Sequence, residues 1–359
     1  VRLLTSRIGV LNKLTVFNLQ PLYNGNTKCI DFRLMAAYLL ADQGHDVWLA
    51  TFRGNPISSE HVNYTFKNPD YWDFSLDEQG IYDVPALIDL VLIKSGKKKL
   101  SIVCMSIGCA YVYMALTTDT SYNDKIHKIV NLAPAIHLSH VEAPGWSSLN
   151  TLSKLFQTFF PTAVHTGKMP FSENLIELGF VPCGHQARRR ICVTPLLDLI
   201  GFEPSQNNHI TLAKLLAVTK IRFGLKMLKH ILQRVDSGKF QRFDYGPKKN
   251  KQMYGTTEAP EYDLSRVRVE SMLSIISRTD RVTVPKAIKM FQDELPPSVH
   301  QSWKVVNHPD FTHLDFLLHD NVKELVYDDI IEFLEKDNQV ARNTLTGALK
   351  QQAKRIPNV

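Results

Sequence analysis

Ser106 stands at the end of a short apolar run, where its hydroxyl could serve as a nucleophile. The segment 100–105 is almost wholly apolar and predicts a buried strand, and 107–116, rich in Ala, Met and Tyr, predicts a helix. A serine at such a strand-to-helix corner lies in a sharp turn that exposes its hydroxyl at the top of a sheet. Taken alone, the pattern fits nucleophilic catalysis by Ser106 and an ordinary buried turn serine equally well.

A nucleophilic serine needs a base within hydrogen-bond reach and a carboxylate that orients the base. Asp280 follows the predicted strand 269–276, and His313 follows the predicted strand 303–306. The order serine, acid, histidine, with each residue on a loop after a strand, fits a catalytic triad of Ser106, Asp280 and His313.

Other residues near the same strands compete for two of these roles. His308 and His319 are alternative bases, and Asp310 and Asp315 are alternative acids. Taken alone, Asp280 is also compatible with an aspartate that only caps its loop. The three residues on successive loops are a stronger pattern than any one of them.

Motifs for other chemistries are absent from the sequence. It has no H-E-x-x-H, no paired C-x-x-C, no G-x-x-x-x-G-K-[ST] and no G-x-G-x-x-G, and its 13 histidines lack zinc-site spacing. No nucleic-acid motif is present either. We therefore expect no metal, no other cofactor and no nucleic-acid partner. The sequence specifies no oligomeric state.

The surrounding elements predict how these residues are held. Strands alternate with helices over residues 1–140 and again over 256–337, which predicts an α/β fold with a mostly parallel sheet covered on both faces. Helical periods dominate residues 141–255, which resemble an insertion, and 338–359 form a polar tail. The predicted strands cover residues 14–19, 46–52, 100–105, 128–133, 269–276 and 303–306, and the predicted helices cover 34–43, 84–95, 107–116, 285–295 and 322–334. Asp83 is the expected acidic cap of the helix at 84–95.

Composition is that of a globular protein, with 44% hydrophobic and 21% charged residues among 359. No apolar run is long enough for a transmembrane helix. The chain begins with Val and no leader follows, so either a signal peptide has been removed or the sequence starts inside the protein.

The net charge of +7 is concentrated in residues 141–255, which hold 16 Lys and Arg against 7 Asp and Glu. Two interpretations fit this concentration of positive charge. The residues form solvated helix faces, or they attract an anionic lipid surface or substrate.

Five cysteines leave at least one free thiol. Cys104 and Cys109 flank the serine and are expected to be small buried apolar residues rather than disulfide partners. Cys183 and Cys192 could close a short loop. The sequon at Asn63 is compatible with glycosylation in a secretory compartment.

A series of short segments resembles, in the same order, the acid lipase family, which includes gastric and lysosomal acid lipases and many insect relatives. The segments are 44–49, 53–55, 71–75, 82–86, 132–134, 237–241, 243–246 and 312–316. The resemblance implies an α/β-hydrolase fold whose inserted block is a helical cap over a lipid-ester site, and it implies secretion or lysosomal delivery. The family's nucleophile, acid and base fall on Ser106, Asp280 and His313. The family also has a disulfide in the cap. Cys183 and Cys192 have a similar position and spacing, so the resemblance implies a disulfide between them.

Departures from the family pattern affect the residues around the nucleophile. The family elbow G-H-S-Q-G is replaced by 104–108, C-M-S-I-G, and the family's oxyanion segment H-G-L falls on 17–19, F-N-L. The backbone N–H groups of Leu19 and Ile107 are the oxyanion donors that the resemblance implies. Asn18 in place of glycine could alter the first of these loops. The family's N-terminal strands are also missing, so an unpaired sheet edge is expected.

The hypothesis that follows is a serine ester hydrolase, a lipase, that cleaves acylglycerols or related lipid esters through an acyl-enzyme. The alternative is a catalytically weakened, lipase-like protein that binds lipid, and a structural or storage protein is a third, weaker interpretation. The basic inserted block would make transient contact with a lipid surface.

Overall fold

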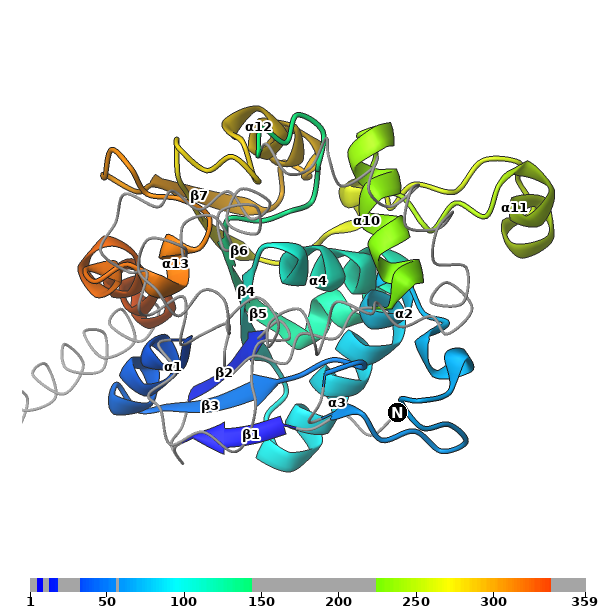
Figure 1. The fold of residues 1–359 in the computed structure, drawn as a ribbon. Coiled ribbons are helices and arrows are strands. Elements are labelled where there is room, and N and C mark those ends of the chain that lie inside the picture. Colours follow the sequence, from blue (N-terminus) through cyan, green and yellow to red (C-terminus); the bar gives the residue numbers. More distant parts are fainter. Residues whose placement is uncertain (1–4, 9–12, 19–32, 56–57, 144–223, 337–359) are drawn as a thin grey trace, which may run out of the picture.

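A seven-stranded sheet forms the centre of the computed structural model, which describes residues 5–8, 13–18, 33–55, 58–143 and 224–336 (Figure 1). The strand order is β1-β3-β2-β4-β5-β6-β7. The strands are β1 Thr5–Ile8, β2 Lys13–Asn18, β3 His45–Ala50, β4 Leu100–Met105, β5 Ile126–Leu132, β6 Ser271–Ile276 and β7 His300–Val305. All neighbouring pairs are parallel except β1 with β3. The predicted, mostly parallel sheet is confirmed.

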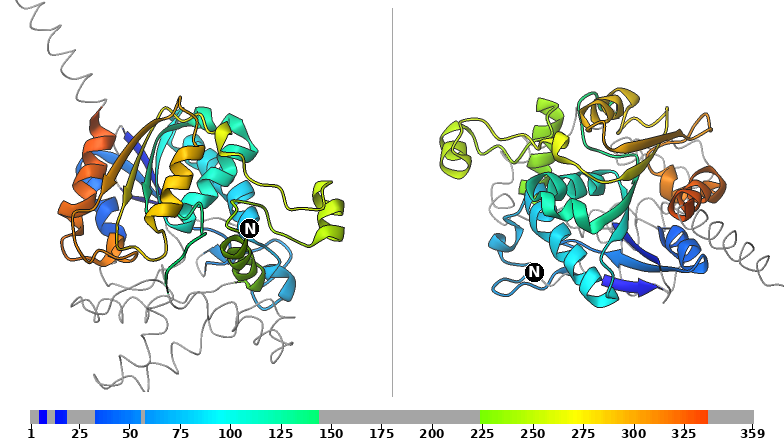
Figure 2. Two further views of the ribbon diagram at one scale, coloured as in Figure 1. Left: turned by 90° about the horizontal axis from the view of Figure 1, so that it is seen from above. Right: turned by 180° about the vertical axis from the view of Figure 1, so that it is seen from behind.

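Helices cover both faces of this sheet, as the alternation of strand and helix predicts. The helices that flank it are α1 Arg33–Asp42, α3 Val84–Ser95, α4 Ile107–Thr118, α12 Pro285–Glu294, α13 Asp315–Leu318, the π-helix η8 Lys323–Tyr327 and the helical residues 328–336. Helices α3, α4 and α12 pack on one face, and α1 with η8 and residues 328–336 packs on the other (Figure 2). Side chains of β3 alternate between these two cores, as the two-residue period of a strand requires.

The elements between β5 and β6 contribute no strand to the sheet among the described residues. Helix α10 spans Leu225–Ser237, and α11 spans Pro247–Tyr254. An isolated bridge between Gln241 and Glu261 closes the base of the segment that carries α11, which stands away from the sheet and its helices (Figures 1 and 2). A 3-10 turn, η7 Leu264–Arg266, then leads toward β6.

Two features of the N-terminal half differ from the sequence-based expectations. The edge of the sheet is occupied by the antiparallel strand β1, which was not predicted. Asp83 makes no capping hydrogen bond, because the π-helix η3 Gln79–Asp83 runs directly into α3, and its residues are already helical. Its carboxylate instead accepts hydrogen bonds from Nε of Arg53 at 2.9 and 3.0 Å and from the backbone N–H of Arg53 at 3.1 Å.

The true start of this helical stretch is the capping box of Ser75 with Glu78. Ser75 precedes the short helix α2 Leu76–Glu78, which continues into η3. The remaining short elements are the 3-10 helices η2 Pro69–Trp72 and η4 Thr120–Lys125. None of the helices in the described ranges is long and apolar enough to cross a membrane.

Candidate active site

Ser106 occupies the sharp turn between β4 and α4 with backbone angles φ 53° and ψ −129°. A positive φ is uncommon for a residue with a side chain, and such strain costs on the order of 1–3 kcal/mol. Three backbone hydrogen bonds hold the turn. The N–H of Ser106 donates to the carbonyl of Leu132 at 2.9 Å, and its own carbonyl accepts from the N–H groups of Cys109 at 3.0 Å and Ala135 at 3.1 Å. The strained turn leaves the half-buried Ser106 side chain at the carboxyl end of the central strand.

The structure brings together the three residues predicted as a triad. Nε2 of His313 lies 2.8 Å from Oγ of Ser106, and Nδ1 of His313 lies 2.7 Å from Oδ2 of Asp280. The residues follow β4, β6 and β7, and the carboxyl ends of parallel strands meet at one edge of a sheet. His313 and Asp280 are 6% and 2% exposed, so water competes little for these hydrogen bonds.

The surroundings of Asp280 keep its carboxylate ionised. Oδ1 accepts hydrogen bonds from the N–H groups of Val282 at 2.8 Å and Thr283 at 3.0 Å, and Oδ2 accepts one from the hydroxyl of Thr283 at 2.6 Å. Burial is the largest influence and acts to raise the pKa of Asp280, but the charge and hydrogen bond of His313, together with Thr283, outweigh it, so this pKa lies below its usual value. An ionised carboxylate only accepts hydrogen bonds, so the Nδ1 of His313 carries the proton and Nε2 can accept from Ser106.

The competing acids and bases are engaged elsewhere. Oδ2 of Asp315 accepts hydrogen bonds from the N–H of Thr312 at 2.6 Å and its hydroxyl at 2.7 Å, which closes the loop that carries the histidine. Asp310 donates its backbone N–H to Nδ1 of His308 at 3.3 Å, and the rings of His308 and His319 contact each other at 4.7 Å between centroids. The structure therefore joins none of these four residues to Ser106.

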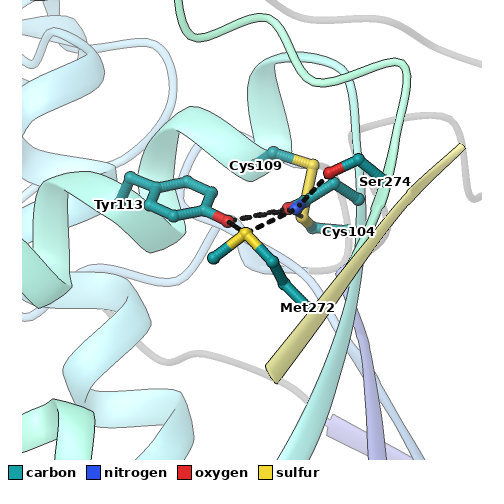
Figure 3. The surroundings of a disulfide bond; sticks show 6 residues. Cys104, Cys109, Tyr113, Met272 and Ser274 are labelled. Atoms are coloured by element: carbon teal, nitrogen blue, oxygen red, sulfur yellow. Dashed lines mark hydrogen bonds between the residues drawn. A yellow bond between two sulfur atoms is a disulfide. The ribbon is translucent and has the colours of Figure 1, made fainter. Parts of the chain in front are cut away.

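The expectation that Cys104 and Cys109 are unpaired was wrong. Both are buried, as expected, but they form a disulfide with their Cα atoms 5.0 Å apart (Figure 3). A strand-to-helix reversal brings residues five apart in sequence close together, which a strand and a helix taken separately do not indicate. Two cysteines placed symmetrically about a predicted turn were the signal that could have revealed the bond.

A buried polar network below this disulfide was not predicted either. Nδ2 of Asn131 on β5 donates to Oγ of Ser274 at 3.0 Å and lies 3.1 Å from the hydroxyl of Tyr113 on α4. All three side chains are fully buried, and burial raises the pKa of Tyr113 well above its usual value. The network connects β5 and β6 to the helix that begins at the serine (Figure 3).

The other predicted site residues have different outcomes. Ile107 is the first residue of α4, so its N–H is among those that no carbonyl within the helix accepts. Asn63 is exposed, and its backbone N–H donates to Nδ1 of His61 at 3.1 Å. Leu19, Cys183 and Cys192 lie outside the described residues.

Comparison with known proteins extends over most of the chain. No protein-family model matches it. Lipase member K of Mus musculus is 32% identical over 308 residues, 84% of this chain and 74% of the relative. Gastric triacylglycerol lipase of Bos taurus is 29% identical over 306 residues, again 84% of this chain and 74% of the relative. A solved structure of a soluble variant of monoglyceride lipase from Saccharomyces cerevisiae has a TM-score of 0.54 at 14% identity, over 93% of this chain and 91% of that one, and shares its α/β-hydrolase fold. With about 30% of the residues identical over most of both sequences, the chain belongs to the acid lipase family of carboxylic ester hydrolases.

Proposed function

We propose that this protein is a serine lipase that cleaves acylglycerols or related lipid esters through an acyl-enzyme. The observation that carries the proposal is the hydrogen-bonded row from Ser106 through His313 to Asp280. His313 removes the proton of Ser106 as Oγ attacks the acyl carbonyl, then gives that proton to the leaving alcohol. A water activated by the same imidazole releases the acid, and Asp280 stabilises the imidazolium that forms in each half-reaction.

The developing negative charge on the acyl oxygen needs fixed donors. The N–H of Ile107 is suited to this role, because it belongs to the first turn of α4 and adjoins the nucleophile. We propose the N–H of Leu19 as the second donor. It directly follows β2, which pairs with β4.

The substrate class follows from the family and from the distribution of charge. A cap formed by residues 141–255, between core parts 1–140 and 256–337, would cover the acyl chain, and its lysines and arginines would attract an anionic lipid surface. Exposed Lys248, Lys249 and Lys251 on α11 belong to this block. Secretion or lysosomal delivery, a glycan on the exposed Asn63 and a cap disulfide between Cys183 and Cys192 are further parts of the proposal.

The altered residues around Ser106 favour a second candidate, a lipid-binding protein that turns over slowly. Cys104 and Ile107 replace residues of the family elbow, and Asn18 at the end of β2 replaces a glycine of the oxyanion segment. Loss of one oxyanion donor lowers the rate by a factor of about 10²–10³. This candidate keeps the fold and the pocket but not an efficient reaction.

The experiment that tests the first candidate compares Ser106→Ala with Ser101→Ala, a buried serine earlier on the same strand. Hydrolysis of a medium-chain p-nitrophenyl ester and labelling by a fluorophosphonate should both disappear in Ser106→Ala and persist in Ser101→Ala. Wild-type protein that takes up no fluorophosphonate, yet binds a fluorescent fatty acid, would support the binding protein. Undiminished turnover by Ser106→Ala would remove Ser106 from the mechanism.

A further inference from the structure

We propose that the Cys104–Cys109 disulfide is a positioning element that holds Ser106 and the Ile107 N–H in their reactive arrangement. The inference rests on the proposed serine mechanism and adds a residue pair to it. Cys104 is next to last in β4, and Cys109 lies in the first turn of α4. The bond therefore closes a ring of the chain that contains the nucleophile (Figure 3).

The ring adds a covalent restraint to a turn that backbone hydrogen bonds already hold. The N–H of Ser106 is tied to β5 through Leu132, and its carbonyl is tied to the helix through the N–H of Cys109. The disulfide is a covalent link between the end of the strand and the start of the helix. It fixes the angle between the two elements, and that angle decides where Oγ of Ser106 lies relative to His313.

The sulfur of Cys104 contacts the buried polar network. Sγ of Cys104 lies 3.4 Å from Oδ1 of Asn131, whose amide contacts Ser274 on β6 and Tyr113 on α4. Tyr113 is one helical turn beyond Cys109, so the same network holds the helix that the disulfide anchors. The bond thus connects the turn to a fully buried, hydrogen-bonded part of the core.

Burial indicates that this bond is a permanent constraint. Cys104 and Cys109 are 1% and 0% exposed, and labile regulatory disulfides are typically exposed or strained. The sulfur of Cys104 also contacts the buried network, through Oδ1 of Asn131. Removing the two sulfur atoms should leave substrate binding unchanged and should affect the chemical step.

The size of the effect follows from the geometry that catalysis demands. A displacement of about 1 Å in a reacting group lowers a rate by up to about 10²-fold. We expect kcat to fall about tenfold to a hundredfold when the bond is absent, with KM within about twofold of wild type. The rate of fluorophosphonate labelling should fall in parallel, because it reports the reactivity of Ser106.

The first measurement asks whether the bond exists in the folded enzyme. The peptide between Lys99 and Lys125 contains both cysteines, and in protein denatured before alkylation it should take up an alkylating reagent only after reduction. Alkylation of both thiols in a sample of active enzyme that is denatured without reduction would overturn the proposal.

The second measurement compares two double variants, Cys104→Ala/Cys109→Ala and Cys104→Ser/Cys109→Ser. The serine at 104 keeps a polar atom that can donate to Asn131, so this variant guards against loss of folding. The control is Met114→Ala, which removes a fully buried side chain from the same helix but leaves the disulfide intact. It should lower the melting temperature and keep kcat, when all proteins are assayed well below their melting temperatures.

The outcomes separate this inference from the proposed function. Wild-type kcat in either folded double variant, with Ser106→Ala inactive, would overturn the positioning role alone. A fall in kcat shared by Met114→Ala would show that loss of stability, not positioning, explains the effect. Activity that survives in Ser106→Ala would instead overturn the serine mechanism.

Discussion

Gly80 lies so close to Met114 that a Cβ on this glycine would sit 2.5 Å from the Cβ of Met114 and 2.9 Å from its sulfur. The two residues join the π-helix η3 to α4, the helix that begins directly after Ser106. Close approach of these helices brings the apolar side chains of α4 into a fully buried layer. The absence of a side chain at position 80 is therefore what allows η3 and α4 to pack this closely.

Gly80→Ala should destabilise the protein by about 1–3 kcal/mol, because overpacking forces neighbouring side chains to shift. Met114→Ala alone should cost about 2–5 kcal/mol through the cavity that it leaves. In the double variant the contact with the sulfur is gone, but the 2.5 Å contact with Cβ remains because alanine keeps that atom, so the loss should be only moderately smaller than the sum. Urea unfolding of the four proteins measures this coupling, and strictly additive losses would contradict the close packing.

His230 on α10 is fully buried and connects this helix to the segment that follows it. Its Nε2–H donates to the carbonyl of Gln241 at 3.0 Å, and its Nδ1 lies 3.8 Å from Oδ1 of Asp77. Burial is the largest influence and lowers the pKa of His230, the charge of Asp77 opposes this change, and the charge of Arg234 adds to it. The net pKa lies below the usual value of 6.5, so the ring is neutral in the folded protein near neutral pH.

Acid should therefore weaken the fold through His230. The unfolded chain binds a proton at this histidine as the pH falls below about 6.5, whereas the folded chain binds it only at lower pH. The free energy of unfolding should decrease between pH 7 and pH 5 by at most about 1.4 kcal/mol per pH unit from this residue. His230→Gln keeps an amide donor for the carbonyl of Gln241. Its free energy of unfolding, measured by urea titration at each pH, should therefore decrease less between pH 7 and pH 5. Identical slopes for the two proteins would refute this role.

Much of the geometry of the candidate site could be predicted, because each of its three main residues follows a strand that local sequence identifies. The strand β4 has the predicted bounds, α3 does too, and Ser106, Asp280 and His313 each follow a strand. Parallel strands place their carboxyl ends together, so residues distant in sequence could be assigned to one edge of the sheet without knowledge of its register.

The features that escaped prediction depend on contacts between elements. The hydrogen bonds of Asn131 require the register of β5 against β6, where Asn131 pairs with Ser274, and no local pattern encodes that register. The role of Asp83 depended on a π-helix that runs into α3, and the disulfide depended on the tightness of the turn at Ser106. In each case a side chain could be recognised as polar or reactive, but its partner lay in another element.

The choice between Asp280 and Asp315 as the catalytic acid gives a sharp test of the site. Both are nearly fully buried, and both follow the last strands of the sheet. Burial raises the pKa of Asp315 above its usual value despite the hydrogen bonds from Thr312, whereas the pKa of Asp280 is lowered. Only Asp280 contacts the imidazole of His313 in the structure, at 2.7 Å.

Asp280→Asn should lower kcat by roughly 10⁴-fold, because an amide in this place no longer keeps the proton on Nδ1 of His313. Asp315→Asn retains an oxygen that can accept from Thr312, so its kcat should stay within about tenfold of wild type while its stability falls. Ester hydrolysis and urea unfolding, measured on both variants, separate the two roles. The reverse ranking of activities would transfer the acid role to Asp315. Equal, small losses of kcat in the two variants would mean that the imidazole of His313 keeps its tautomer without either carboxylate.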